Sequence, residues 1–147
     1  MIARRIAIAS LVAATGAFAL SGCGMMGNRD KGAGGVMNVP LSAKNEVPPN
    51  SSTGSGNARV ELDGNVLKWN VTYSGTTGPV TAGHFHGPAQ PGANAGVVVP
   101  FAGPLTSPIV GSATLTPTQV DQVKQGLWYV NLHTAAHPGG ELRGQVK

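Results

Sequence analysis

The amino-acid sequence predicts an all-β fold, an antiparallel Greek-key-like β-sandwich or barrel of about eight short strands with one short helix near residues 117–125. Short runs of alternating apolar and polar residues follow one another from residue 36 onward. Turn residues separate these runs at the spacing of about 8–12 residues that is typical of such folds. The 22 Gly and 11 Pro exclude long helices over most of the chain.

The first half of the expected domain contains three strands. Residues 36–43 include Pro40, which cannot donate to a ladder, so we expect an edge strand there. In residues 58–63 small or apolar side chains alternate with charged ones, which indicates a half-buried strand. Asp63-Gly64-Asn65 is a strong hairpin signal, and residues 67–73 form the expected return strand.

The second half supplies the remaining strands. Residues 80–86 form a strand that ends in a histidine pair, and 97–101 is a continuous apolar run suited to a strand buried on both faces. Further strands are expected over 109–115, 127–133 and 141–147.

One helix has a clear start signal. Thr116 is suited to the N-cap, Pro117 to the first helical position and Gln119 to a capping box, and Gly126 ends the helix.

The N-terminal residues 1–22 are typical of a lipoprotein signal peptide. Arg4 and Arg5 precede an apolar run over residues 6–20, which is too short for a membrane span. Leu20-Ser-Gly-Cys23 resembles a bacterial lipobox, whose cysteine thiol accepts the lipid; the alternative is an ordinary secretory signal with an incidental cysteine. Because Cys23 is the only cysteine, the mature domain has no disulfide.

These segments predict three parts: the signal peptide, a flexible Gly-rich tether over 23–35, and one β domain over 36–147. A lipid on Cys23 would anchor the domain stably to the membrane, at the periplasmic or extracellular side of a bacterial cell envelope. The formal charge of +4 includes the signal peptide, and Lys and Arg do not cluster, so nucleic acid is not an expected partner.

The histidines are the main functional signal, because all four lie in two short segments. His84 and His86 alternate along one expected strand, so they share a face roughly 6–7 Å apart. His133 and His137 form the second pair. Imidazoles without thiolates and with few carboxylates favour one copper ion, with zinc as second choice. The alternative is that these side chains only hydrogen-bond carbonyls at strand ends.

Four motifs closely resemble the CHRD domain, the module named after chordin: Leu41-Ser-Ala43 with Glu46-Val-Pro-Pro49, Gly83-His-Phe-His-Gly-Pro-Ala89, Trp128-Tyr-Val-Asn-Leu-His-Thr134 and Pro138-Gly-Gly-Glu-Leu-Arg-Gly-Gln145. The resemblance implies an all-β domain, often secreted in bacteria, with a poorly defined general function. More distantly, the ligand pattern is similar to that of copper/zinc superoxide dismutases, in which a His-x-His pair and later histidines converge on copper.

Three functions follow as hypotheses. The first is a mononuclear copper superoxide dismutase, an oxidoreductase in which Arg143 draws in the small superoxide anion. The alternatives are a non-catalytic copper carrier and a structural or adhesive envelope domain without metal. For Arg143 the alternative is an ion pair with Glu141, worth ~1 kcal/mol or less.

Overall fold

The computed structural model describes residues 35–147, so the signal peptide, Cys23 and nearly all of the tether lie outside the described residues. The elements follow in the order β1 (Val36–Ser42), η1 (Ala43–Asn45), β2 (Ser55–Asp63), β3 (Val66–Ser74), β4 (Val80–His86), β5 (Val97–Pro100), β6 (Ile109–Thr114), α1 (Pro117–Lys124), β7 (Tyr129–Thr134) and β8 (Leu142–Gln145). Within this part of the chain, no helix has the length and apolar character needed to cross a membrane.

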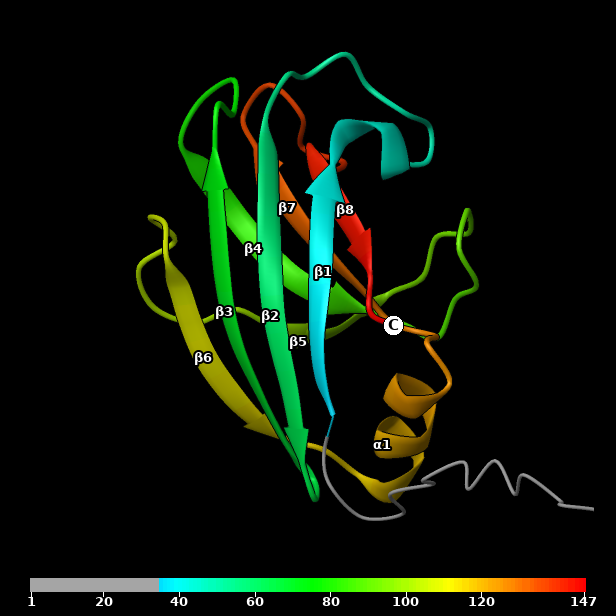
Figure 1. Ribbon diagram of the computed structural model, residues 1–147. Helices are drawn as coiled ribbons and strands as arrows, with labels where there is room; N and C mark the ends of the chain where they lie inside the picture. Colours follow the sequence, from blue (N-terminus) through cyan, green and yellow to red (C-terminus); the bar gives the residue numbers. More distant parts are fainter. Residues whose placement is uncertain (1–34) are drawn as a thin grey trace, which may run out of the picture.

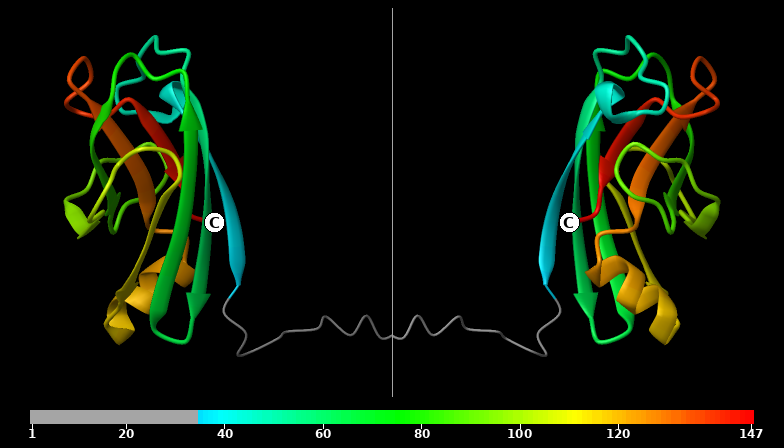
Figure 2. Two further views of the ribbon diagram at one scale, coloured as in Figure 1. Left: turned by 90° about the vertical axis from the view of Figure 1, so that its left-hand side faces the viewer. Right: turned by 90° about the vertical axis from the view of Figure 1, so that its right-hand side faces the viewer.

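The eight strands form one antiparallel sheet in the order β5-β4-β7-β8-β1-β2-β3-β6. The sheet curls into a nearly closed barrel, so that the wall of β1, β2 and β3 faces the wall of β4, β7 and β8 (Figures 1 and 2). Helix α1 lies at the end of the barrel where the β2–β3 turn is (Figure 1). The prediction of an all-β fold with about eight strands and one short helix is therefore confirmed.

Local sequence signals act as expected at two places. Gly64 has a φ of 60°, the left-handed conformation that the β2–β3 turn needs and that glycine adopts without strain. Helix α1 begins with a complete capping box: the Gln119 N–H donates to Thr116 Oγ1 at 3.3 Å, and the Thr116 N–H donates to Gln119 Oε1 at 2.9 Å.

Two strand predictions are wrong. Strand β1 is not an edge, because it lies between β2 and β8. Its ladder with β8 is confined to the pair Ser42–Arg143, so the missing N–H of Pro40 breaks no ladder hydrogen bond to β8. Strand β5 is not buried on both faces, because Val97 is 51% exposed and Val99 is the one buried residue of the strand; β5 lies at the edge of the sheet, next to β4. An apolar run alone does not reveal whether other parts of the protein cover both faces of a strand.

The inner faces of both walls pack on one apolar core. An aromatic cluster occupies it, with the rings of Trp69 and Phe85 5.3 Å apart and those of Phe85 and Trp128 6.1 Å apart. In β7 all six residues are buried, although only every second side chain can face the core. The outer face of β7 is therefore covered as well, by loops, and the candidate site lies under this cover.

Candidate metal centre

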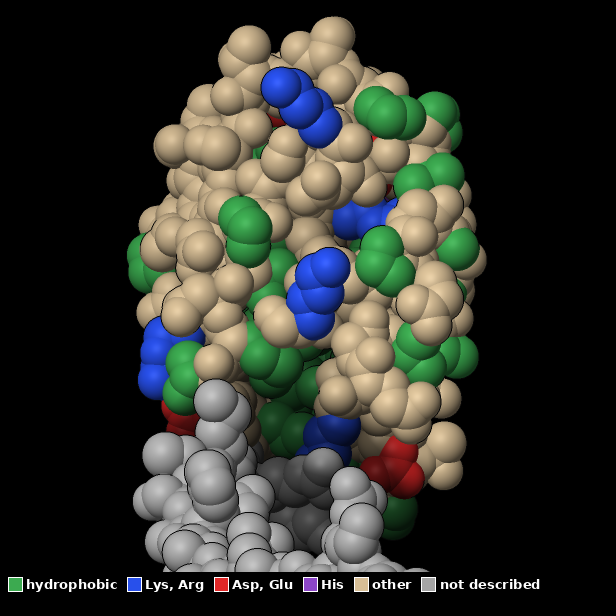
Figure 3. All heavy atoms as spheres, turned by 45° about the vertical axis from the view of Figure 1, so that its right-hand side comes forward, with side chains coloured by type: hydrophobic (Ala, Val, Ile, Leu, Met, Phe, Trp, Pro, Cys, Tyr) green, Lys and Arg blue, Asp and Glu red, His purple; other side chains and the backbone are tan. Residues whose placement is uncertain are grey.

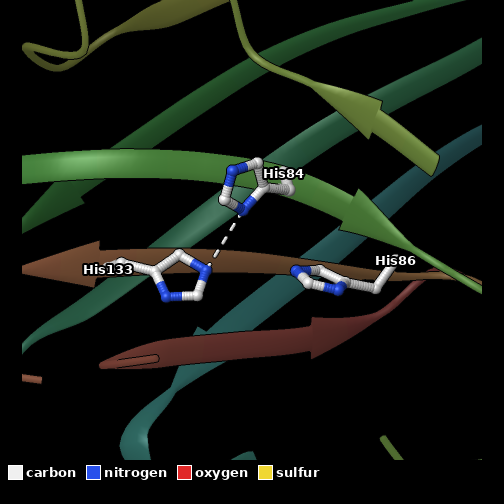
Figure 4. A group of neighbouring side chains, drawn as sticks. All are labelled: His84, His86 and His133. Carbon is white, nitrogen blue, oxygen red and sulfur yellow. Dashed lines mark hydrogen bonds between the residues drawn. The ribbon is translucent and has the colours of Figure 1, made fainter. Parts of the chain in front are cut away.

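Three of the four histidines meet on the outer face of β4 and β7. In the β4–β7 ladder His84 pairs with Asn131, and His133 pairs with Ala82. Cross-strand partners share a face, and residues two apart on one strand share it too, so His86 and His133 lie on the same face as His84. Figure 4 shows the three rings converging from the two strands. We call His84, His86 and His133 the histidine triad.

The triad is compact enough to hold one ion. One ring nitrogen from each histidine lies within 4.8 Å of those from the other two. His84 Nδ1 and His133 Nε2 are 3.2 Å apart, within hydrogen-bond distance (Figure 4). His86 and His133 are each only 9% exposed, whereas His84 is half-buried and stands nearest to solvent.

Backbone carbonyls orient two of the three rings. His86 Nδ1 lies 3.0 Å from the Ala95 carbonyl oxygen, and His133 Nδ1 lies 2.9 Å from that of Pro138. Because a carbonyl oxygen only accepts, both Nδ1 atoms carry the hydrogen in the neutral ring. Each Nε2 is then left with its lone pair toward the centre of the triad, which is the arrangement that a metal-binding imidazole requires.

The electrostatic environment also favours neutral rings. Burial, together with the neighbouring His133 and His86, lowers the pKa of His84. Burial lowers the pKa of His86 as well, against the hydrogen bond to the Ala95 carbonyl, which raises it. Both imidazoles therefore keep their lone pairs to lower pH than a free histidine does.

One atom of the triad is left without a partner. His86 Nε2 is buried and makes no hydrogen bond to any of residues 35–147, a state that costs free energy unless something binds the lone pair. His133 Nε2 also presents a lone pair and accepts from His84 Nδ1 at 3.2 Å, so the hydrogen on that His84 nitrogen is directed at His133 and not at His86 Nε2. A metal ion fits this donor set.

The fourth histidine stands apart from the triad. His137 is not among the residues whose ligand atoms lie within 4.8 Å of one another. Its backbone closes the turn after β7, where the His137 N–H donates to the Thr134 carbonyl at 3.1 Å and its own carbonyl accepts from the Gly140 N–H at 3.1 Å. In this structure His137 shapes the loop that carries Pro138, and its role as a fourth ligand stays a prediction.

Arg143 is buried beside the site, at 2% exposure. Its guanidinium donates to the Ala93 carbonyl and, at 2.9 Å, to Asn94 Oδ1, and its Cζ lies 3.5 Å from the centroid of the Tyr129 ring. The alternative considered for Arg143, an ion pair with Glu141, does not form. Glu141 precedes β8 and accepts hydrogen bonds from other loops, and the described residues form ion pairs only on the exposed surface.

A buried carboxyl lies on the same face of the sheet. Glu46 is 7% exposed, and its carboxyl accepts a hydrogen bond from the Asn131 amide at 2.5 Å. Burial raises the pKa of Glu46 to about 7, and the Asn131 hydrogen bond and the nearby Arg143 oppose this only in part. Glu46 is outside the group of possible ligands, so the donor set consists of imidazoles alone.

Sequence reasoning missed the groups that hold the triad. Tyr129 is among them, because its ring stacks on that of His86 with the centroids 4.8 Å apart and the planes at 2°. A signal for Tyr129 existed, since pairing β4 with β7 places it opposite His86. The carbonyls of Ala95 and Pro138 carry no side-chain signal, and only the folded loops reveal them.

The CHRD domain family model matches residues 37–146 of the chain. No curated protein and no solved structure matches the chain.

Proposed function

The chain belongs to the CHRD domain family, and from this premise and the histidine triad we propose that it is an envelope-anchored domain that binds one copper ion. The observation that carries the proposal is the buried His86 Nε2, which has no hydrogen-bond partner in the described part of the chain and faces the rings of His84 and His133 (Figure 4).

The donor set favours copper over other ions. Imidazole binds Cu, Zn, Ni and Fe, whereas Mg and Ca prefer oxygen ligands, and the triad contains no carboxylate. Copper stands at the top of the divalent affinity order for such ligands, and zinc is the second choice. The Ala95 and Pro138 carbonyls hold two of the ligands in the tautomer that leaves Nε2 free to bind.

The activity that we propose at this site is superoxide dismutation, in which two superoxide ions and two protons give O₂ and H₂O₂. Bound copper would supply the one-electron redox chemistry for both half-reactions. The protein residues hold three imidazoles together and leave His84 half-exposed, so that a small anion can approach from that side. The ligand pattern is similar to that of copper/zinc superoxide dismutases.

A non-catalytic copper carrier is the second candidate. Arg143, the expected guide for an anion, is 2% exposed and bonded to a loop. With the Arg143 side chain buried and bonded in this way, it does not supply the electrostatic attraction that rapid turnover of superoxide would use, and this favours a site that only holds copper.

The location of the protein is part of the proposal. The lipobox-like sequence that ends at Cys23 supports a lipid anchor at the cell envelope, on the periplasmic or extracellular side. Copper and superoxide would then both reach the domain from outside the cytoplasm.

Superoxide decay measured by pulse radiolysis separates these candidates. The copper-loaded protein is compared with His86→Ala and with His137→Ala, which removes a histidine outside the triad. Fast decay in wild type and His137→Ala, lost in His86→Ala, supports the enzyme. Copper retention without accelerated decay supports the carrier, and absence of retained copper contradicts both.

A further inference from the structure

Tyr129 lies between a proposed metal ligand and Arg143. Its ring is parallel to the His86 imidazole, with the centroids 4.8 Å apart, and the Arg143 Cζ lies 3.5 Å from its centroid. One face of a phenol ring cannot hold both groups at these distances without a clash. The imidazole and the guanidinium therefore lie on opposite faces, in a stack of three planar groups.

The same three residues also meet through the loop after β4. Arg143 Nη2 donates to the Ala93 carbonyl at 2.5 Å and Nη1 to Asn94 Oδ1 at 2.9 Å. The next residue, Ala95, donates its N–H to Tyr129 Oη at 3.1 Å and accepts from His86 Nδ1 at 3.0 Å. The carbonyl that orients His86 thus belongs to the loop segment that Arg143 holds.

The Arg143 guanidinium is poorly placed to act on an incoming anion at the triad. The Tyr129 ring separates it from His86, and the side chain is 2% exposed. The Arg143 side chain lines a groove of about 580 Å³, which is also lined by residues of β1 and of the loop after η1. Figure 3 looks onto this side of the molecule, and no histidine side chain is visible there.

We propose that Arg143 is a positioning residue for His86. Through the Tyr129 ring and the loop of residues 93–95, it holds the imidazole with Nδ1–H on the Ala95 carbonyl and Nε2 toward the other two ligands. The consequence for metal affinity rests on the proposed copper site, but the orientation of the ring does not. This role needs the flat, forked shape of arginine, whereas attraction of an anion needs only its charge.

Arg143→Lys separates shape from charge. Lysine keeps the positive charge but has neither the fork that reaches Ala93 and Asn94 nor the plane that stacks on Tyr129. The positioning role predicts that Arg143→Lys and Arg143→Gln disturb His86 equally. An anion-guiding role predicts that the lysine variant behaves as wild type and that only the glutamine variant is impaired.

The first readout is the tautomer of His86 in the metal-free protein, from ¹⁵N NMR of the imidazole at about pH 8. Wild type is expected to show hydrogen on Nδ1 alone, and both Arg143 variants a mixture of tautomers. Asn94→Ala, at an exposed position, removes one contact of Arg143. If the Arg143 variants do not fold, the tautomer of His86 in Asn94→Ala tests the positioning role in their place. Arg59→Gln, which changes an arginine in an exposed ion pair, is the matched control and leaves the spectrum unchanged.

The second readout is copper affinity, measured by competition with a chelator of known affinity. Both Arg143 variants are expected to bind copper ~10–100-fold more weakly, the usual effect of removing the support of a metal ligand. An unchanged His86 tautomer in Arg143→Lys and Asn94→Ala, with affinities within about twofold of wild type, overturns the proposal. If wild type binds no copper, the proposed function fails, and the NMR result still decides whether Arg143 positions His86.

Discussion

Glu141 holds together the loops that cover the candidate site. It is 0% exposed, and its carboxylate accepts hydrogen bonds from Ser52 Oγ, Thr134 Oγ1, and both the N–H and the hydroxyl of Thr77. Burial alone would raise the pKa of this carboxyl, but the hydrogen bonds outweigh burial and lower the pKa to about 2. The turn that carries the Pro138 carbonyl is thereby attached to two other loops.

The pKa gives the size of this contribution. A lowering from 4.5 to about 2, at about 1.36 kcal/mol per pKa unit, corresponds to ~3 kcal/mol of folding free energy at neutral pH. Glu141→Gln replaces one acceptor oxygen with an amide donor, which leaves buried hydroxyl or N–H groups without an acceptor. We therefore expect Glu141→Gln to lower the free energy of unfolding by ~3 kcal/mol at neutral pH.

Urea denaturation followed by tryptophan fluorescence measures this difference at several pH values. Because the folded-state pKa is lowered, the wild-type advantage is present above about pH 4.5 and is lost as the pH falls toward about 2. Glu61→Gln is the control, since Glu61 forms an exposed ion pair with Arg59 at 3.1 Å, and we expect it to change stability by ~0.5 kcal/mol or less. A loss below ~1 kcal/mol for Glu141→Gln at neutral pH, or a loss that does not vary with pH, refutes the reasoning.

Three further predictions concern other parts of the domain. Because the pKa of Glu46 is raised to about 7, the contribution of this carboxyl to stability falls as the pH rises from about 4.5 through about 7. Glu46→Gln should remove this pH dependence in the same denaturation series, and an unchanged dependence would contradict the raised pKa. Gly111→Ala places a Cβ 2.4 Å from Trp69 Cζ2 and should lower the free energy of unfolding by ~1–3 kcal/mol. In Gly78→Ala the added Cβ meets no atom within 4 Å, so this control should leave stability nearly unchanged. Thermal denaturation measures both variants, and equal melting temperatures would count against the prediction. Because burial lowers the pKa values of His84 and His86, both rings of the metal-free protein should stay neutral to lower pH than a free histidine; an NMR titration in which either ring has an ordinary or raised pKa would be inconsistent with these shifts.

Much of the fold follows from local signals. The turn at Gly64 and the capping box at Thr116 form as predicted, because each depends on a few adjacent residues. The place of β1 in the sheet and the burial of β5 were predicted wrongly, since both depend on residues far away in the chain. Neither Pro40 nor the apolar run from Val97 carries information about those neighbours.

The site was predictable as far as strand alternation reaches. Alternation places His84 and His86 on one face, and the β4–β7 register brings His133 beside them. The supporting groups belong to loops, whose course no periodicity describes. Arg143 shows this limit: its spacing from Glu141 suggested an ion pair, but the loop after β4 folds over the sheet and supplies neutral oxygen partners instead.

The most direct test of the account is the amount and coordination of copper that the purified protein retains, measured by metal analysis and electron paramagnetic resonance. The histidine triad predicts one copper ion per chain, bound through three imidazole nitrogens, with retention lost in His133→Ala and kept in His137→Ala. Absence of stoichiometric copper in wild type, or equal retention in His133→Ala, would contradict the claim that the three imidazoles form a metal site.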